Sequence, residues 1–321
     1  MKPNLFLLGA QKCATTSLAA TLASTGQISF GRLKEPFILC YDDVSVLGDC
    51  FESEESLARS SKFDGSQVQF GRLYSALYEG VNRVFHFGDA STLYLPSETA
   101  AKRIKEFYPD SKFVVVLRDP VKRSLSAFSH YQQRMFPNGS LDDLVLSDDK
   151  FGVLRFSRYF EQVRFWLDLF PRESFFITTF EELLSDSGCV FSALSEFLAI
   201  DLEVSQIEKE NPGLGRVTQS RLLSKFVQIS NQVGLRTYPK QYVPASLEER
   251  LRSMTLPDGG INSRRKKRLF VEKALLKGGC FRAIGGTAFE RISAELKELF
   301  EDEYQKLPQL LPEVDFSRWN H

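Results

Sequence analysis

The sequence predicts an α/β fold in which an open parallel sheet carries helices on both faces, followed by a helical, loop-rich C-terminal third. Three observations predict it. Short apolar segments alternate with helical patterns over the first 200 residues, as in doubly wound sheets. These segments show little polar alternation, which is typical of parallel strands buried on both faces. The first of them ends at Gly9, where a short loop and a helical pattern follow.

The predicted elements alternate in order along the chain. The strands are rich in Val, Ile and Phe, and they cover residues 4–9, 83–88, 112–117 and 174–180. The helices between and after them cover residues 16–24, 97–108, 121–133 and 156–170. Pro120 precedes the third helix, where its fixed φ angle suits a first turn. The fourth helix carries apolar residues at helical spacing, which predicts one buried face.

After about residue 200 the strand signals fade. Helical patterns cover residues 219–233 and 289–307, and Ile292, Leu296, Leu299 and Leu307 define the apolar side of the second. We expect residues 1–321 to form a single domain. Residues 1–200 would be its α/β core, and residues 201–321 a helical and loop region.

Composition excludes several classes of function. Lys and Arg number 41, equal to Asp and Glu, so no net charge draws the chain to nucleic acid. No apolar run approaches the roughly 20 residues of a membrane span. The five cysteines are scattered and no secretion signal is present, which predicts reduced thiols in the cytoplasm. The three histidines are far apart in sequence, so we expect no metal site. The sequence does not indicate an oligomeric state.

The loop after the first strand reads GAQKCATT from Gly9. It has the length of the ATP-binding pattern G-x-x-x-x-G-K-[ST], but Ala14 and Thr15 replace the second glycine and the lysine, and the lysine stands at Lys12. The amides of residues 13–17 and the hydroxyls of Thr15, Thr16 and Ser17 still suit a phosphate at a helix N-terminus. The fold is therefore P-loop-like, although no carboxylate for a Mg²⁺–triphosphate site is evident.

A second anion site is predicted in FVVVLRDPVKRSLSAFSHY, residues 113–131. Arg118 ends a buried strand and Ser126 follows it by eight residues, so both can face one crevice. A guanidinium and a hydroxyl together can bind a phosphate monoester. Arg123 either assists them or is an exposed cation. The alternative makes Arg118 a surface partner of Asp119 and Ser126 a solvated residue.

Both segments resemble parts of one family. LLGAQKCATTSL is similar to the 5′-phosphosulfate loop of sulfotransferases that use 3′-phosphoadenosine 5′-phosphosulfate (PAPS), with Ala14 where the family has glycine. Arg118 and Ser126 resemble the family's 3′-phosphate segment, with the same separation. The resemblance implies that PAPS is the co-substrate and 3′-phosphoadenosine 5′-phosphate (PAP) the product. The residues it assigns to the nucleotide are Gln11, Lys12, Cys13, Ala14, Thr15, Thr16, Ser17, Arg118 and Ser126.

The resemblance also implies in-line transfer of a sulfuryl group to a hydroxyl or amine of a carbohydrate or small-molecule acceptor. Lys12 would stabilise the leaving phosphate. Glu35, in RLKEPFIL, matches the family's K-E-P-x-[FY] segment and would be the base, with a pKa raised by burial. Alternatively, Glu35 pairs with Lys34 or Arg32 on the surface. His86 is the rival base.

Further similarities extend the match along the chain. VFHFGDASTLYL places Asp89 and Ser91 at a strand mouth near the acceptor, whereas segments 157–183, 191–200 and the final LPEVDFSRW resemble structural parts of the family. Residues 277–286, with Lys277 and Gly278, would close over the 3′-phosphate as a nucleotide lid. The basic run 264–268 is interpreted as a solvated face. Two alternatives stay open: a degenerate P-loop nucleotide kinase or NTPase, and a non-catalytic nucleotide-binding protein.

Overall fold

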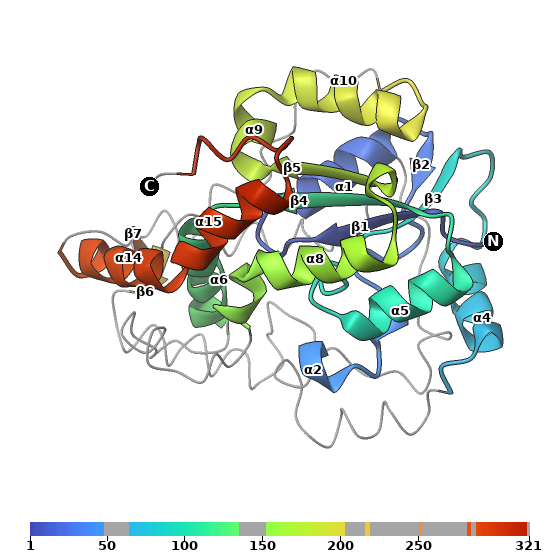
Figure 1. Ribbon diagram of the computed structural model, residues 1–321. Coiled ribbons are helices and arrows are strands. Elements are labelled where there is room, and N and C mark those ends of the chain that lie inside the picture. Colours follow the sequence, from blue (N-terminus) through green and yellow to red (C-terminus); the bar gives the residue numbers. More distant parts are fainter. Residues whose placement is uncertain are drawn as a thin grey trace.

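The computed structural model describes residues 1–47, 64–134, 152–202, 216–218, 251, 281–283 and 287–319. Its centre is a five-stranded parallel sheet with strand order β2-β3-β1-β4-β5 (Figure 1). The strands are β1 (Leu5–Gly9), β2 (Ile28–Ser29), β3 (His86–Asp89), β4 (Lys112–Leu117) and β5 (Phe175–Thr179). The strand order reverses between β1 and β4, and in such sheets ligands bind beyond the carboxyl ends at this point.

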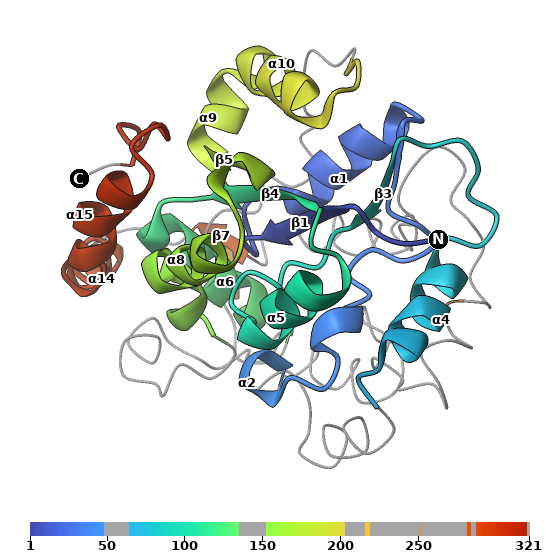
Figure 2. The ribbon, with the colours of Figure 1, turned by 45° about the vertical axis from the view of Figure 1, so that its right-hand side comes forward.

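Helices cover both faces of the sheet, as predicted. In both views α1 and α10 lie on one side of the strands, and α5 and α8 on the other (Figures 1 and 2). The α-helices in the described ranges are α1 (Thr15–Ser24), α2 (Val44–Leu47), α4 (Gln67–Leu77), α5 (Glu98–Phe107), α6 (Pro120–Arg134), α8 (Tyr159–Leu169), α9 (Phe180–Ser185), α10 (Ser187–Leu198), α14 (Thr287–Leu299) and α15 (Glu301–Leu310). The same ranges contain the 3₁₀ turns η1 (Ile38–Cys40), η3 (Arg155–Ser157) and η4 (Arg172–Ser174). In the part of the chain described here, none of these helices has the length and apolarity needed to cross a bilayer.

The core lies on both faces of the central strands, which explains why they lack polar alternation. Every residue of β1 is buried. On β4, the ring of Phe113 packs against Trp166, Phe170 and Phe175, with centroids 5.4, 4.6 and 4.7 Å away. Aromatic pairs at these separations each add about 0.5–1.5 kcal/mol beyond the area they bury. This cluster joins β4 and β5 to α8 and fixes the sheet against one helical layer.

The C-terminal helix differs from the prediction. Residues 289–307 were expected to form one helix, but the chain forms α14 and α15, with a break at Phe300. Phe300 is fully buried, while Leu299, predicted on the apolar side, is 37% exposed. The break turns Phe300 inward and Leu299 outward, which a single helical period does not anticipate.

The rest of the C-terminal third is described only in part. Two short strands, β6 (Arg216–Thr218) and β7 (Phe281–Ala283), form an antiparallel pair, although this region was predicted to hold helices and loops. β7 falls within the predicted lid 277–286, so part of that segment is a strand. The predicted helix 219–233, the basic run 264–268, Lys277 and Gly278 lie outside the described residues.

Candidate active site

The loop between β1 and α1 begins at the centre of the sheet. Gly9 has φ +152°, and a Cβ there would lie 3.2 Å from both the Thr92 carbonyl oxygen and Leu95 Cβ, so glycine is required by conformation and by space. The amide of the next residue, Ala10, donates to the Val116 carbonyl at 2.8 Å. The loop therefore starts bound to β4, at the position where the strand order reverses.

The start of α1 presents an anion-binding end. Ala14 precedes the helix with φ 59° and ψ 16°, and its side chain provides no cap. The amides of Thr15, Thr16 and Ser17 belong to the first turn, where a helix offers them no acceptor. Thr15 and Ser17 are buried and Thr16 is exposed. The partial positive charge of these amides suits a phosphate.

Cys13 can contribute its backbone amide to the site, but not a reactive thiol. Its side chain is completely buried, and burial raises the pKa of the Cys13 thiol to about 12. A thiol with such a pKa is not a nucleophile at neutral pH. Its predicted place in the nucleotide site therefore depends on its amide alone.

Arg118 connects the two predicted anion sites. Its Nη1 atom donates to the Lys12 carbonyl at 3.1 Å, and its guanidinium lies 4.4 Å from the centre of the Phe180 ring. The side chain is 5% exposed, so it is not a surface cation. Within the described residues, its buried Nε atom has no hydrogen-bond partner. An orphaned buried donor is costly in a native structure unless a ligand satisfies it.

Asp119 does not pair with Arg118 as the alternative reading required. Its Oδ1 atom accepts from the Lys122 amide at 3.0 Å and from the Tyr304 hydroxyl at 3.3 Å. Asp119 therefore caps the first turn of α6. The surface ion pair considered from the sequence is wrong.

One face of α6 lies against the loop. Arg123 is fully buried and donates from Nε to the Gln11 carbonyl and from Nη2 to Gln11 Oε1, both at 3.1 Å. On the same helix, His130 Nδ1 lies 3.1 Å from Lys12 Nζ. Ser126 falls three residues after Arg123 and four before His130, so it shares their face. Arg123 is thus a buried support for Gln11 and not an exposed cation.

His130 was not anticipated from the sequence. It stands 118 residues from Lys12. The three histidines were considered as metal ligands, and only His86 was also considered as a base. The one available signal was its spacing of four from Ser126, which places both on the same helical face. The spacing points to the site only once the structure shows that this face of α6 contacts the loop at Lys12.

Glu35 lies beside the loop and is held from two sides. Its Oε1 atom accepts from the Thr92 hydroxyl at 2.6 Å and pairs with Lys34 Nζ at 3.1 Å. Its side chain keeps 35% of its surface exposed. Arg32, the other partner considered for Glu35, pairs with Glu79 at 2.9 Å.

The pKa of Glu35 is lower than expected from the sequence. Burial raises it, but the Lys34 ammonium and the Thr92 hydrogen bond more than offset burial, so the net shift of the pKa is downward. The predicted raised pKa is therefore wrong. The charge of Lys12 also lowers this pKa, which places Lys12 and Glu35 in one electrostatic environment.

Three other candidate residues, His86, Asp89 and Ser91, are buried. His86 begins β3, at the amino end of the sheet, and its Nε2 lies 2.9 Å from the Leu198 carbonyl oxygen. This position excludes it as a base at the carboxyl ends. Asp89 and Ser91, expected at a strand mouth, have no exposed surface. They lie in the interior, where Ser91 Oγ accepts from the Phe37 amide at 3.1 Å.

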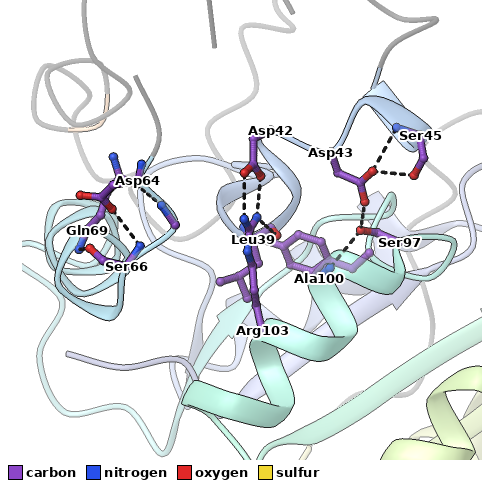
Figure 3. A network of polar contacts seen from close by, with 12 residues as sticks. Leu39, Asp42, Asp43, Ser45, Asp64, Ser66, Gln69, Ser97, Ala100 and Arg103 are labelled. Atoms are coloured by element: carbon purple, nitrogen blue, oxygen red, sulfur yellow. Dashed lines mark hydrogen bonds and ion pairs between the residues drawn. The ribbon is translucent and has the colours of Figure 1, made fainter. Parts of the chain in front are cut away.

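The chain following Glu35 is fastened to α5 by a polar network (Figure 3). Arg103 donates to both carboxylate oxygens of Asp42, at 2.5 and 2.8 Å, and to the Leu39 carbonyl at 3.0 Å. One residue further on, Asp43 Oδ2 accepts from the Ser97 hydroxyl at 2.5 Å. Bidentate arginine–carboxylate pairs fix geometry as well as charge. The η1 turn is thereby held on the helical layer.

Comparison with known proteins identifies the family. Residues 3–204 of the 321 match the model of the sulfotransferase family. The protein belongs to this family. The matched range contains all the candidate site residues, namely residues 11–17, Glu35, Arg118 and Ser126.

Individual sulfotransferases are similar over shorter stretches. Heparan sulfate glucosamine 3-O-sulfotransferase 6 of Homo sapiens is 26% identical over 113 residues, which cover 33% of this chain and 33% of that protein. The membrane-associated sulfotransferase kil1 of Dictyostelium discoideum is 43% identical over 51 residues, or 16% of this chain and 11% of that one. This chain thus spans about a third of the length of the human relative.

A solved structure supports the same fold. The sulfotransferase from Alicyclobacillus acidocaldarius superposes with a TM-score of 0.51 and 25% identity, over 66% of this chain and 87% of that chain. The chain therefore shares an α/β fold with this solved sulfotransferase along most of that protein's length.

Proposed function

We propose that this protein transfers a sulfuryl group from PAPS to a hydroxyl or amine of a carbohydrate or small-molecule acceptor. The observation that carries the proposal is the 3.1 Å hydrogen bond from Arg118 Nη1 to the Lys12 carbonyl. It joins a helix N-terminus suited to one phosphate with a buried guanidinium suited to another. A nucleotide phosphorylated at both the 5′ and the 3′ position has the matching charges.

The residues present fit such a nucleotide. The first-turn amides and hydroxyls of Thr15, Thr16 and Ser17 would bind its 5′ end. The orphaned Nε of Arg118 and the Ser126 hydroxyl would bind its 3′-phosphate. Gln11, Cys13 and Ala14 would shape the loop backbone around it. PAPS, when bound, supplies the sulfuryl group together with a phosphate leaving group.

Lys12 and Glu35 would perform the two charge-dependent tasks of the transfer. The Lys12 ammonium would neutralise charge that develops on the leaving phosphate. The Glu35 carboxylate would accept the proton of the attacking hydroxyl or amine. Its lowered pKa keeps it ionised at neutral pH, so the base is always in its active form there. Lys34 and Thr92 hold that carboxylate in place.

The proposal includes an acceptor class and a compartment. The heparan sulfate relatives are named for carbohydrate sulfation, which supports a carbohydrate acceptor here. Cys13, Cys40 and Cys189 are free thiols, which supports a reducing compartment such as the cytoplasm. Cell fractionation followed by blotting tests the compartment, and recovery of the protein outside the cytosolic fraction would contradict it.

Ligand binding distinguishes the proposal from a nucleotide kinase. A ligand that binds only the folded state raises the melting temperature with concentration. We expect PAP without metal to raise it and Mg-ATP at the same concentration to leave it unchanged. Stabilisation by Mg-ATP alone would support a kinase or NTPase, and PAP binding without any transfer would support a non-catalytic binding protein.

Transfer of labelled sulfate from PAPS into an acceptor tests the assigned roles. We expect Lys12→Ala and Glu35→Ala each to reduce the rate by about 10²–10⁴-fold. The matched controls are Lys102→Ala and Glu98→Ala, which remove an exposed ion pair on α5 and should leave the rate within twofold. Full activity in both loop variants would refute these roles even in an active enzyme.

A further inference from the structure

A buried carboxylate lies beneath residues 35–39, here called the Glu35 segment. Asp89, at the end of β3, has no exposed surface. Its Oδ1 accepts from the Ser91 hydroxyl at 2.6 Å, and its Oδ2 accepts from the hydroxyls of Tyr94 and Tyr74, each at 2.8 Å. Two of these hydroxyls continue to the backbone of the Glu35 segment.

The two continuations form separate hydrogen-bond chains. The Phe37 amide donates to Ser91 Oγ at 3.1 Å. The Leu39 amide donates to the Tyr94 hydroxyl oxygen at 3.1 Å. Each chain therefore runs from a backbone N–H through one hydroxyl to one oxygen of Asp89. The third hydroxyl, from Tyr74, has a hydrogen bond to the same carboxylate but belongs to neither chain.

The direction of both chains is fixed by chemistry. A backbone amide can only donate, so each hydroxyl oxygen accepts from the segment and directs its own proton to Asp89. Three hydroxyl protons then converge on one side chain, an arrangement that favours an ionised carboxylate, which only accepts. A proton on Asp89 would add a fourth donor and weaken the hydrogen bond accepted by the oxygen that carries it.

The geometry points to Asp89 as a positioning residue that holds the Glu35 segment at the site. The inference rests on the function proposed above for Glu35. Glu35 and Phe37 both have positive φ angles, 57° and 55°, a conformation that persists only where surrounding contacts impose it. The Leu39 carbonyl, held by Arg103, fixes the far end of the segment. The two Asp89 chains fix the part between.

The surroundings of Asp89 make this support dependent on pH. The titratable groups that face it are Lys34, Cys40, Tyr74, Tyr78, Tyr94 and Tyr108. Burial raises the pKa of Asp89 to about 6, although the hydroxyl hydrogen bonds and Lys34 act against the rise. Burial also raises the pKa values of the tyrosines and of Cys40, so these groups stay neutral. We expect both chains to be complete above pH 7 and disturbed at pH 5.

Hydrogen exchange tests the inference without any enzymatic turnover. The protection factors of the Phe37 and Leu39 amides are measured by NMR. The reference is the amide of Phe170, the residue after α8, which donates to the Trp166 carbonyl. We expect Ser91→Ala to lower protection at Phe37 about tenfold and leave Leu39 unchanged. Tyr94→Phe should do the reverse. Tyr74→Phe is the matched control, because it removes one hydrogen bond to Asp89 and should change neither amide.

In the wild type, the same two protection factors should fall about tenfold between pH 7.5 and pH 5, since the ionised fraction of Asp89 falls to about one tenth. In Asp89→Asn, protection of at least one amide should be low at both pH values. Loss of protection in Tyr74→Phe equal to that in the other variants, or unchanged protection in all of them, would overturn the inference.

Kinetics separate positioning from general stability. We expect Asp89→Asn to reduce kcat about 10-fold or more and to leave the affinity for PAP within twofold. In the wild type kcat should fall as pH drops through about 6, and in Asp89→Asn this pH dependence should be absent. A fall in PAP affinity equal to the fall in kcat would overturn the positioning role. Selective amide exchange in a protein that transfers no sulfate would instead refute the proposed function and leave the structural support by Asp89 intact.

Discussion

At the scale of single residues, backbone strain gathers around the candidate site. Six non-glycine residues in the described ranges have positive φ angles, and four of them are Lys12, Ala14, Glu35 and Phe37. Such conformations cost about 1–3 kcal/mol each and persist where the surroundings impose them. Arg118 and His130 contact Lys12, and Thr92 contacts Glu35. The strain therefore marks the two segments assigned to the donor and the base.

Ala14 allows a direct test of this strain. Its left-handed conformation costs alanine about 1–2 kcal/mol, and glycine would relieve it while losing about 0.5–1 kcal/mol through greater freedom when unfolded. We expect Ala14→Gly to stabilise the fold by about 0.5–1 kcal/mol in urea denaturation. Ala20→Gly, inside α1, is the control and should destabilise by about 1 kcal/mol. Equal destabilisation by both would contradict the strain at Ala14.

Asp89 links stability to pH with a definite sign. Its pKa is about 6 in the folded chain, against a usual value of 3.8. Between these values the unfolded chain releases the proton first, so the stability that protonated Asp89 contributes is lost as pH rises. The free energy of unfolding of the wild type, relative to Asp89→Asn, should fall by about 3 kcal/mol from pH 3.5 to pH 7. Urea denaturation measures this difference. A difference that stays constant or rises with pH would contradict the raised pKa of Asp89.

At the scale of elements, helix ends are supported by neighbouring elements as well as by their own caps. The first turn of α8 provides an example. Glu303 of α15 is buried, and its Oε2 accepts from the Phe160 amide at 2.8 Å. Burial raises the pKa of Glu303, which means that burial disfavours its charge. The backbone hydrogen bonds that the carboxylate accepts from the first turn of α8 act in the opposite direction. The contact ties the C-terminal helix to the layer beneath the sheet.

Substitutions at Glu303 should distinguish the contribution of its hydrogen-bond acceptor to stability from the contribution of its charge. We expect Glu303→Ala to destabilise the fold by about 1–3 kcal/mol, because it leaves a buried amide without an acceptor. Glu303→Gln keeps an acceptor oxygen and should cost less than half as much. Glu301→Ala, on the exposed side of α15, should stay within 0.5 kcal/mol. Thermal denaturation ranks the three, and equal losses for Ala and Gln would contradict the capping role.

Sequence patterns predicted the elements whose own residues carry the signal. The strands β1, β4 and β5 were found because buried strands are short and largely apolar. β3 (His86–Asp89) overlaps the predicted strand 83–88 over residues 86–88 only, because its own residues include His, Gly and Asp. β2 has only two residues, so it has no period, and its pairing with β3 is a tertiary event. The break at Phe300 likewise depends on burial against other elements. The contact of Lys12 with His130 joins positions 118 residues apart, which no local pattern encodes.

At the scale of the whole molecule, the end of the described chain supports the site near its beginning. Trp319 is 1% exposed, and its Nε1 donates to Glu181 Oε2 at 3.1 Å. The residue before Glu181 is Phe180, whose ring lies under the Arg118 guanidinium. Trp319 therefore contacts α9 at Glu181, and α9 in turn contacts Arg118 through Phe180. This agrees with the structural role that the resemblance of the C-terminal segment implied.

Removal of this support should weaken the whole fold. We expect Trp319→Ala to destabilise the protein by about 3–5 kcal/mol, because a large buried side chain leaves a cavity. The neighbouring Arg318 is exposed, and Arg318→Ala should change stability by less than 0.5 kcal/mol. Urea denaturation measures both. A loss below 1 kcal/mol in Trp319→Ala would show that the segment is not docked.

The most direct measurement compares the affinities of PAP and adenosine 5′-monophosphate by titration calorimetry, since the two differ only in the 3′-phosphate. We expect the wild type to bind PAP at least 10-fold more tightly, because a hydrogen bond to a charged group contributes about 1.5–3 kcal/mol. Ser126→Ala and Arg118→Gln should reduce that preference, whereas Lys12→Ala should weaken both nucleotides together. Equal wild-type affinities, or a preference that survives both Ser126→Ala and Arg118→Gln, would contradict a single site built from the two phosphate-binding segments.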